Sequence, residues 1–189
     1  MAREWLSIQE YNTFLSAVDD SLMYSLLTKL CYNGGFRISE ILNAKRRDFI
    51  KENEVYCYLK MDNTKRRVGK PTVQPIDPKM YAEIQLYCNE KGIANDQYVF
   101  QSLSGGKLSY ITCLKRIQRY TEKARIDKNI TTHSFRRSRA THLLKEGRDL
   151  AFVSGFLRHK NVVVTMEYLN IEKEWMAEEL YGEKKPSYY

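Results

Sequence analysis

Apolar side chains recur at three- and four-residue spacing near the start of the chain, which is typical of one face of an α-helix. Ser7 and Glu10 stand at the beginning of this pattern and match a capping box, in which each side chain accepts the other's backbone N–H. A helix is therefore predicted from about residue 8 to residue 18. The apolar positions on its buried face are Ile8, Tyr11, Phe14, Leu15 and Val18.

Two further helices are predicted on either side of a glycine pair. The apolar pattern continues over about residues 20–32 and stops at Asn33-Gly34-Gly35. Glycine readily takes the left-handed conformation that ends many helices, so the second helix should end there. A short helix is predicted over about 37–42, directly after this turn. Arg37 therefore lies at a junction between two helices.

Two short segments rich in β-branched and aromatic residues, 55–59 and 72–76, predict strands. The polar, basic stretch over 62–70 joins them, so the pair is predicted to form a hairpin with a cationic tip. Helical spacing returns afterwards, and a loop at about 102–106 separates the first two of the later helices. These helices are predicted over 78–90, 110–125, 133–146, 149–157, 162–168 and 173–181. Residues 1–189 are thus predicted to form a single, mainly α domain with a small antiparallel sheet (α+β).

Charge is distributed unevenly along the chain. Lys and Arg number 31 against 23 Asp and Glu, for a formal net charge of +8, while a hydrophobic content of 43% is sufficient for a folded core. Most of the excess lies in two basic clusters. The first contains Lys115, Arg116, Arg119, Lys123, Arg125, Lys128, Arg136, Arg137, Arg139, Lys145 and Arg148, and the second Lys60, Lys65, Arg66, Arg67 and Lys70. Two basic clusters in a folded domain predict a polyanionic partner, and double-stranded DNA is expected because binding it releases counterions.

Several classes of protein are excluded by what the sequence lacks. No apolar run reaches the roughly 18 residues of a membrane span, and residues 1–5 do not resemble a secretory signal, so we expect a cytoplasmic protein without a membrane partner. When bound to DNA it would be associated with the nucleoid. The four cysteines form no Cys-x-x-Cys pair and are predicted to be reduced and mostly buried.

The sequence also lacks a match to the motifs that bind metals or nucleotide cofactors. Gly106-Lys107 lacks both the earlier glycine and the following Ser or Thr that a phosphate-binding loop needs. His133 and His142 lack the four-residue spacing and the third ligand of a zinc site. Asp19-Asp20 is better explained as a helix start. We therefore expect no metal and no cofactor.

A set of polar residues remains that suits a phosphodiester. Each has a commoner explanation alone: Arg37 as a surface cation, Tyr168 as one of 14 tyrosines, and residues 133–136 as a solvated helix end. Their order along the chain is more specific. Residues 35–42 (GFRISEIL) are followed by the basic hairpin, 133–136 (HSFR), 139–144 (RATHLL), His159 and, nine residues later, Tyr168. This order resembles the catalytic domain of tyrosine recombinases, the phage integrase family, from about residue 5 to the last residue.

The resemblance implies a DNA breaking and rejoining fold and strand transfer through a covalent 3′-phosphotyrosine. The residues implied to surround the scissile phosphate are Arg37, Lys65, His133, Arg136, His159 and Tyr168. Glu40 matches the acidic residue that supports the first arginine. The hairpin offers Lys60, Lys65 and Lys70 for the lysine, and Lys65 is chosen for its position at the turn after the first strand.

Elementary chemistry agrees with these roles. A guanidinium group can donate two parallel hydrogen bonds to the non-bridging oxygens of a phosphate. Two such groups would neutralise the negative charge that develops on those oxygens. A tyrosine phenol has a pKa of about 10 and needs a base to lose its proton. His133 suits that base, while the hairpin lysine suits the acid that protonates the departing 5′ oxygen. His159 would hold the phosphate by a hydrogen bond. Because the ester conserves bond energy, rejoining needs no nucleotide cofactor.

Further DNA contacts are predicted from the basic clusters: Arg66, Arg67, Lys70, Arg137, Arg139 and Arg158. Arg158 also departs from the family pattern, because glycine commonly stands immediately before the second histidine. It is predicted either to add a phosphate contact or to perturb the pocket.

A second departure is that the chain has no segment matching the N-terminal core-binding domain with which these enzymes clamp DNA. The chain is therefore a fragment or a minimal catalytic module. A tetrameric synapse with other protomers is implied by the family, and the predicted helix over 173–181 would pack on its own chain or on a neighbour. Two alternatives stay open: type IB topoisomerase-like relaxation of DNA, and a DNA-binding or regulatory module without turnover.

Overall fold

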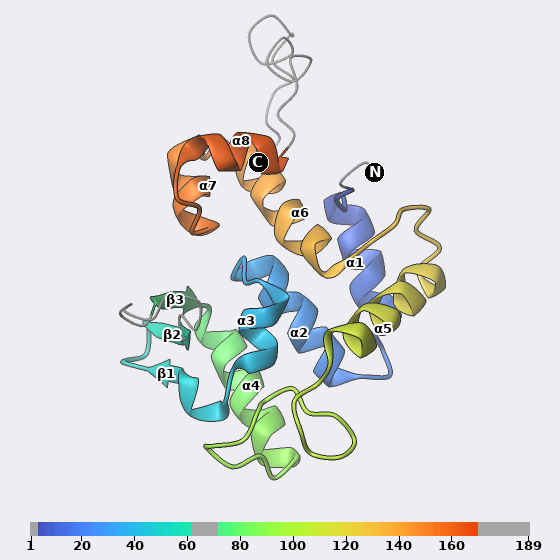
Figure 1. Ribbon diagram of the computed structural model, residues 1–189, viewed down its shortest axis with the longest axis vertical. Helices are drawn as coiled ribbons and strands as arrows, with labels where there is room; N and C mark the ends of the chain where they lie inside the picture. Colours follow the sequence, from blue (N-terminus) through green and yellow to red (C-terminus); the bar gives the residue numbers. More distant parts are fainter. Residues whose placement is uncertain (1–3, 62–71, 170–189) are drawn as a thin grey trace, which may run out of the picture.

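The first three helices follow the capping and glycine signals of the sequence. Helix α1 (Ile8–Ala17) begins with the predicted capping box, in which the Ser7 N–H donates to Glu10 at 2.7 Å and the Glu10 N–H donates to Ser7 at 3.1 Å. Helix α2 (Leu22–Asn33) ends at the glycine pair, and α3 (Ile38–Asn43) begins after Arg37. The computed structural model describes residues 4–61 and 72–169 (Figure 1).

A three-stranded antiparallel sheet follows the short 3₁₀ helix η1 (Arg46–Asp48). Its strands are β1 (Phe49–Lys51), β2 (Cys57–Met61) and β3 (Thr72–Ile76), in the order β1-β2-β3. The sequence reading missed β1, which is too short to show alternation, and placed the start of β2 two residues early. Pro75 is accommodated because β3 lies at an edge of the sheet. The predicted hairpin tip lies outside the described residues.

The later helices lie close to their predicted bounds. They are α4 (Pro78–Glu90), α5 (Tyr110–Lys123), α6 (Thr132–Lys145), α7 (Leu150–Phe156) and α8 (Val162–Leu169). The helix predicted over 173–181 lies outside the described residues. The prediction of a mainly α fold with a small antiparallel sheet is confirmed.

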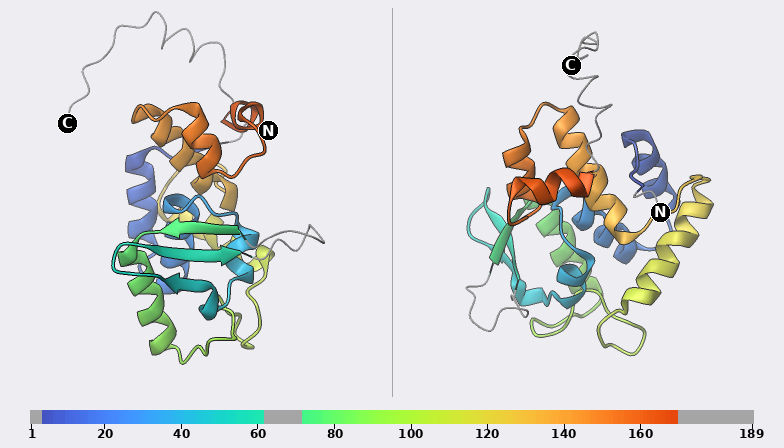
Figure 2. Two further views of the ribbon diagram at one scale, coloured as in Figure 1. Left: turned by 90° about the vertical axis from the view of Figure 1, so that its left-hand side faces the viewer. Right: turned by 45° about the horizontal axis from the view of Figure 1, so that its top comes forward.

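Helix α6 connects two groups of buried apolar side chains. Phe135, near its beginning, packs into the main core, which also contains α1 to α5 and the sheet. Ala140 and Leu143, further along α6, form a smaller cluster with Val153 and Leu157. Figures 1 and 2 show the consequence: α7 and α8 lie against α6 as a separate layer, above α2, α3 and the sheet. The boundary between these two layers is where the candidate site lies.

The cysteines confirm one sequence prediction. All four are buried and free of disulfides. Burial also raises the pKa of each thiol, to about 12 for Cys113, so none is activated as a nucleophile. Within residues 4–61 and 72–169, no helix is long and apolar enough to cross a membrane.

Candidate active site

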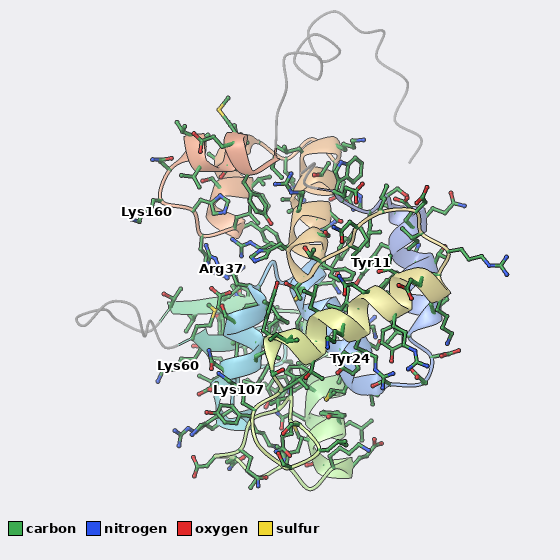
Figure 3. All side chains as sticks on the ribbon, turned by 45° about the vertical axis from the view of Figure 1, so that its right-hand side comes forward. Tyr11, Tyr24, Arg37, Lys60, Lys107 and Lys160 are labelled. Carbon is green, nitrogen blue, oxygen red and sulfur yellow. The ribbon has the colours of Figure 1, made fainter. Side chains whose placement is uncertain are left out.

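Arg37 occupies the N-cap position of α3, and Glu40 stands at the third position of that helix. The three-residue spacing brings the two side chains together. The Glu40 carboxylate accepts the Arg37 backbone N–H at 2.7 Å and the guanidinium Nη1 at 3.0 Å. Figure 3 shows Arg37 between α3 and the layer formed by α7 and α8. The sequence-predicted support of Arg37 by Glu40 is therefore a local consequence of how α3 begins.

Arg136 is a buried cation whose guanidinium group bridges two backbone segments. It lies in the second turn of α6, and only 2% of the residue is exposed. Its Nη1 and Nη2 donate to the carbonyl oxygens of Gly35 and Leu157, respectively. Burial, followed by the nearby positive charge of Arg37, lowers the pKa of Arg136 to about 10. The group therefore keeps its charge at neutral pH, in a position suited to an anion.

His133 precedes Arg136 by about one turn of α6 and is an exposed residue. Partial desolvation is the largest cause of a lowered pKa at His133, and the guanidinium groups of Arg136, Arg37 and Arg137 act in the same direction. The ring is therefore held neutral under conditions where a free histidine begins to take up a proton. A neutral imidazole is the form that accepts a proton from a nucleophile.

His159 and Tyr168 come from the layer formed by α7 and α8. Their ring centroids are 5.2 Å apart at an interplanar angle of 78°, an edge-to-face contact. The Nδ1 atom of His159 lies 2.9 Å from the hydroxyl oxygen of Thr165. Burial, then the charges of Arg136, Arg37 and Arg158, lower the pKa of His159 to about 4.

The Tyr168 hydroxyl points toward the beginning of α6. It donates to the backbone carbonyl of His133 at 3.2 Å. Burial raises the pKa of this phenol, while the positive charges of Arg136, Arg137 and Arg37 oppose that rise. Tyr168 is therefore protonated at neutral pH, and removal of its proton requires a base.

Of the residues predicted around the phosphate, the structure brings five into one place: Arg37, His133, Arg136, His159 and Tyr168. The predicted Lys65 lies outside the described residues, as do Arg66, Arg67 and Lys70. Lys60, the other lysine considered near the hairpin, is exposed on β2.

The remaining predicted DNA contacts engage other parts of the protein in this structure. Arg137 is 4% exposed, and its guanidinium carbon lies 4.7 Å from the centroid of the Tyr168 ring. Arg139 forms an ion pair with Glu146 at 2.8 Å. The side chain of Arg158 is 14% exposed and forms an ion pair with Glu40 at 2.5 Å. Their role as DNA contacts remains a prediction.

Two residues of this region were missed by the sequence reading. Thr165, fully buried, contacts His159, and its three-residue spacing from Tyr168 on α8 is the signal that places both on one helix face. Gln74 on β3 is also buried, and its Nε2 donates to the carbonyls of Gly34 at 3.1 Å and Phe156 at 3.3 Å. No local pattern marks Gln74, because both partners are distant in sequence.

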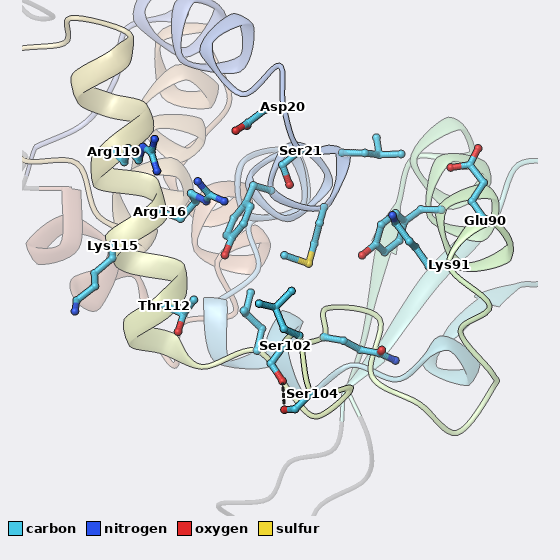
Figure 4. Close-up of a pocket in the computed structure, with 17 residues that line it drawn as sticks. Asp20, Ser21, Glu90, Lys91, Ser102, Ser104, Thr112, Lys115, Arg116 and Arg119 are labelled. Atoms are coloured by element: carbon cyan, nitrogen blue, oxygen red, sulfur yellow. Dashed lines mark hydrogen bonds between the residues drawn. The ribbon is translucent and has the colours of Figure 1, made fainter.

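A separate cavity lies elsewhere in the described part of the chain. It has a volume of about 1080 Å³ and opens between α2, α4, α5 and the loop before α5 (Figure 4). Asp20, Arg116 and Ser102 lie among its lining residues, and none of the five converging residues does. The convergent site lies instead between the layer formed by α7 and α8 and the layer that contains α3. The described residues contain no group of three or more His, Cys, Asp or Glu that would hold a metal.

Comparison with known proteins supports the same interpretation. The chain is 30% identical over 165 residues to the tyrosine recombinase XerA of Pyrococcus horikoshii, covering 86% of this chain and 55% of that protein. It is 25% identical over 181 residues to the tyrosine recombinase XerC of Natranaerobius thermophilus, covering 93% of this chain and 60% of that protein. The chain thus spans little more than half the length of these relatives.

Solved structures show the same fold. A crystal structure of XerA recombinase superposes with a TM-score of 0.78 at 23% identity, covering all of this chain and 67% of that one. XerH recombinase in a post-cleavage complex with its difH substrate gives a TM-score of 0.75 at 23% identity, covering 94% of this chain and 52% of that one. Residues 4–174 match the model of the phage integrase family, and with the site geometry this makes the protein a member of that family.

Proposed function

We propose that this chain cleaves and rejoins DNA strands, through a covalent 3′-phosphotyrosine on Tyr168, in site-specific recombination or integration. The observation that carries the proposal is the convergence of two guanidinium groups, two imidazoles and a phenol from α3, α6, α8 and the α7–α8 connection. The site holds more cations than carboxylates, since Glu40 faces both Arg37 and Arg158, while Arg136 donates to the carbonyls of Gly35 and Leu157. Such a site favours a phosphate.

The proposed reaction exchanges one phosphate ester for another. The phenolic oxygen of Tyr168 attacks the scissile phosphorus, a new P–O bond forms to the tyrosine, and the bond to the 5′ oxygen breaks. His133 takes the phenolic proton, and the 5′ oxygen receives a proton from the hairpin lysine, for which Lys65 is our candidate. Arg37 and Arg136 bind the non-bridging oxygens, where charge accumulates.

Each step breaks one phosphate ester bond and forms another. Attack of a 5′ hydroxyl from another strand can therefore reverse the step without a nucleotide cofactor. We take residues 1–189 as the catalytic domain of this reaction, acting on double-stranded DNA at the nucleoid. Exchange between two duplexes requires further protomers, and a tetrameric synapse is the arrangement we propose. Which DNA sequence is cleaved is a separate question from this chemistry.

Covalent attachment is the direct test. The protein is incubated in EDTA with a pool of nicked duplexes of randomised sequence, which removes the need to know the target, and resolved on a denaturing gel. We expect a protein-DNA adduct that Tyr168→Phe abolishes and that Tyr56→Phe, at an exposed tyrosine outside the site, retains. Absence of an adduct from the whole pool would overturn the enzymatic proposal.

Two further assays, plasmid relaxation and DNA binding, separate the alternatives. Relaxation of supercoiled plasmids of unrelated sequence by the monomer would indicate topoisomerase-like activity. DNA binding that is sensitive to salt, with no adduct and no effect of Tyr168→Phe or His133→Ala, would indicate a binding module.

A further inference from the structure

Arg158 occupies a backbone position that normally belongs to glycine. Helix α7 ends in a Schellman motif: the Arg158 N–H donates to the carbonyl of Gly155 at 2.9 Å, and the His159 N–H donates to that of Ser154 at 3.1 Å. This motif requires a left-handed residue directly after the cap, and Arg158 has φ +52°. A residue with a Cβ is strained there. Arginine at this place therefore carries a backbone strain that glycine would avoid.

The same chain contains three comparison points for this motif. Helices α4 and α6 end with glycine at the equivalent position, Gly92 with φ +64° and Gly147 with φ +82°. Helix α5 ends with an arginine, Arg125, with φ +53°. The Arg125 side chain is exposed, whereas the Arg158 side chain is enclosed between the two layers of the molecule. Arg125 is therefore a matched control for the backbone strain without the buried contacts.

The side chain of Arg158 links the α7–α8 connection to α3 and to Phe36 in the turn before it. Its Nη2 donates to Glu40 Oε2 at 2.5 Å, the same oxygen that accepts the Arg37 backbone N–H. Its guanidinium carbon lies 5.4 Å from the centroid of the Phe36 ring. Glu40 is thus held between two arginines, one on its own helix and one from the loop that carries His159. Within the described residues, Nη1 of Arg158 is buried and has no hydrogen-bond partner.

Resting on the function proposed above, we propose that Arg158 is a positioning residue that fixes Glu40, and through Glu40 the Arg37 guanidinium, relative to His159. The glycine common in the family at this place allows the turn but contributes no side chain. Arginine makes the turn in a strained conformation and ties α3 to the α7–α8 connection. The alternative is a direct contact between Nη1 of Arg158 and a DNA phosphate. It predicts that removing Arg158 weakens the salt dependence of DNA binding.

Stability provides a test that does not depend on activity. Arg158→Gly and Arg125→Gly relieve the same backbone strain, so Arg125→Gly should raise the midpoint of urea unfolding. Arg158→Gly should raise it less or lower it, because the pair with Glu40 is lost. A double-mutant cycle of Arg158→Gly with Glu40→Gln should show non-additive unfolding free energies. The proposal would be overturned, even if the protein cleaves DNA, by additive unfolding free energies in the cycle together with equal stability changes in Arg158→Gly and Arg125→Gly.

Cleavage and binding then separate positioning from contact. With the nicked duplex pool, Arg158→Gly should lower the rate of adduct formation on the order of 10-fold, the scale of a small misplacement of catalytic groups. Arg158→Lys, which keeps one charge near Glu40, should recover part of that rate. The slope of log affinity against log salt should be the same in Arg158→Gly as in the unsubstituted protein. A slope smaller by about 1 would mean that Arg158 contacts a phosphate directly, and the positioning role would be wrong.

If the unsubstituted protein forms no adduct, the proposed function fails, while the stability cycle still decides whether Arg158 and Glu40 are coupled. If the adduct forms and Arg158→Gly cleaves at the unsubstituted rate, only the positioning role fails. The two failures are therefore distinguishable.

Discussion

The imidazole of His159 is held neutral by burial and by the arginines around it, which lower its pKa to about 4. In the unfolded chain a histidine has a pKa of about 6.5. Because the folded pKa is the lower one, the unfolded state takes up a proton first as the pH falls. Stability from this residue is therefore complete above about pH 6.5 and is lost as the pH falls toward 4.

This gives a pH prediction for one residue. His159→Asn should show a shallower decline of unfolding free energy between pH 6.5 and 4.5 than the unsubstituted protein. Urea unfolding at several pH values measures it. His133 and His142 also have lowered pKa values, so part of the decline should persist. An identical decline in the variant and the unsubstituted protein would show that His159 is not the group responsible.

A second prediction at the residue scale concerns Gly35, whose carbonyl accepts a hydrogen bond from Arg136. Its φ is +58°, and a Cβ built on it would lie 2.6 Å from the Phe156 ring. Gly35→Ala should cost at least about 2 kcal/mol of stability, because left-handed strain and overpacking add. Gly92→Ala is the matched control, since Gly92 has φ +64° with nothing within 4 Å of its Cβ.

Equilibrium unfolding of both glycine variants separates the two causes. Gly92→Ala should cost only the strain, on the order of 1 kcal/mol. If both variants lose the same stability, the Phe156 contact contributes nothing. We also expect Gly35→Ala to lower the rate of adduct formation, because the displaced carbonyl is one of the two that orient Arg136.

At the scale of elements, the junction between the two layers is secured by two parallel sets of hydrogen bonds. Arg136 donates to the carbonyls of Gly35 and Leu157. Gln74, from β3, donates to the carbonyls of the residues immediately before each of these. A buried side chain of the sheet thus holds the same two backbone segments that position Arg136.

Gln74→Met keeps the length of the side chain and removes its donors. One buried and one partly buried carbonyl then lose a partner, so stability should fall by about 2 kcal/mol. Adduct formation should slow as well, because the carbonyls that bind Arg136 are adjacent. Val73→Ala, at an exposed neighbour on β3, should change neither quantity appreciably. Unchanged stability in Gln74→Met would show that these bonds do not hold the layers together.

At the scale of the whole molecule, the net charge of +8 predicts DNA binding that weakens with salt. Lys115 and Arg119 are exposed on α5 at four-residue spacing and lie along one side of that helix. The double variant Lys115→Ala/Arg119→Ala should reduce the salt slope of non-specific duplex binding by about 2. Lys29→Ala, at a lysine paired with Glu83, is the control and should leave the slope unchanged.

Fluorescence anisotropy at several salt concentrations measures these slopes. The loss of affinity should be similar for unrelated sequences, because phosphate contacts carry no base information. An unchanged slope in the double variant would mean that this face of α5 does not meet the backbone of DNA.

Local signals in the sequence were sufficient to predict most of the helices and the pairing of Arg37 with Glu40 in the site. The capping box at Ser7 and the three-residue spacing of Arg37 and Glu40 are backbone and nearest-turn effects, so they appear in the sequence itself. The order of polar motifs was sufficient to identify the family. Strand β1 was not predicted, because three residues are too few to show the alternation of buried and exposed positions that marks a strand.

What only the tertiary structure decided depends on contacts between distant segments. The burial of Arg136 against Gly35 and Leu157, and the placement of Gln74 between the layers, join positions far apart along the chain. The same holds for Arg158, which the sequence marked only as an unusual cation and which the fold pairs with Glu40. Helical periodicity reports which face of an element is buried, whereas the partner across that face is set by how the elements pack.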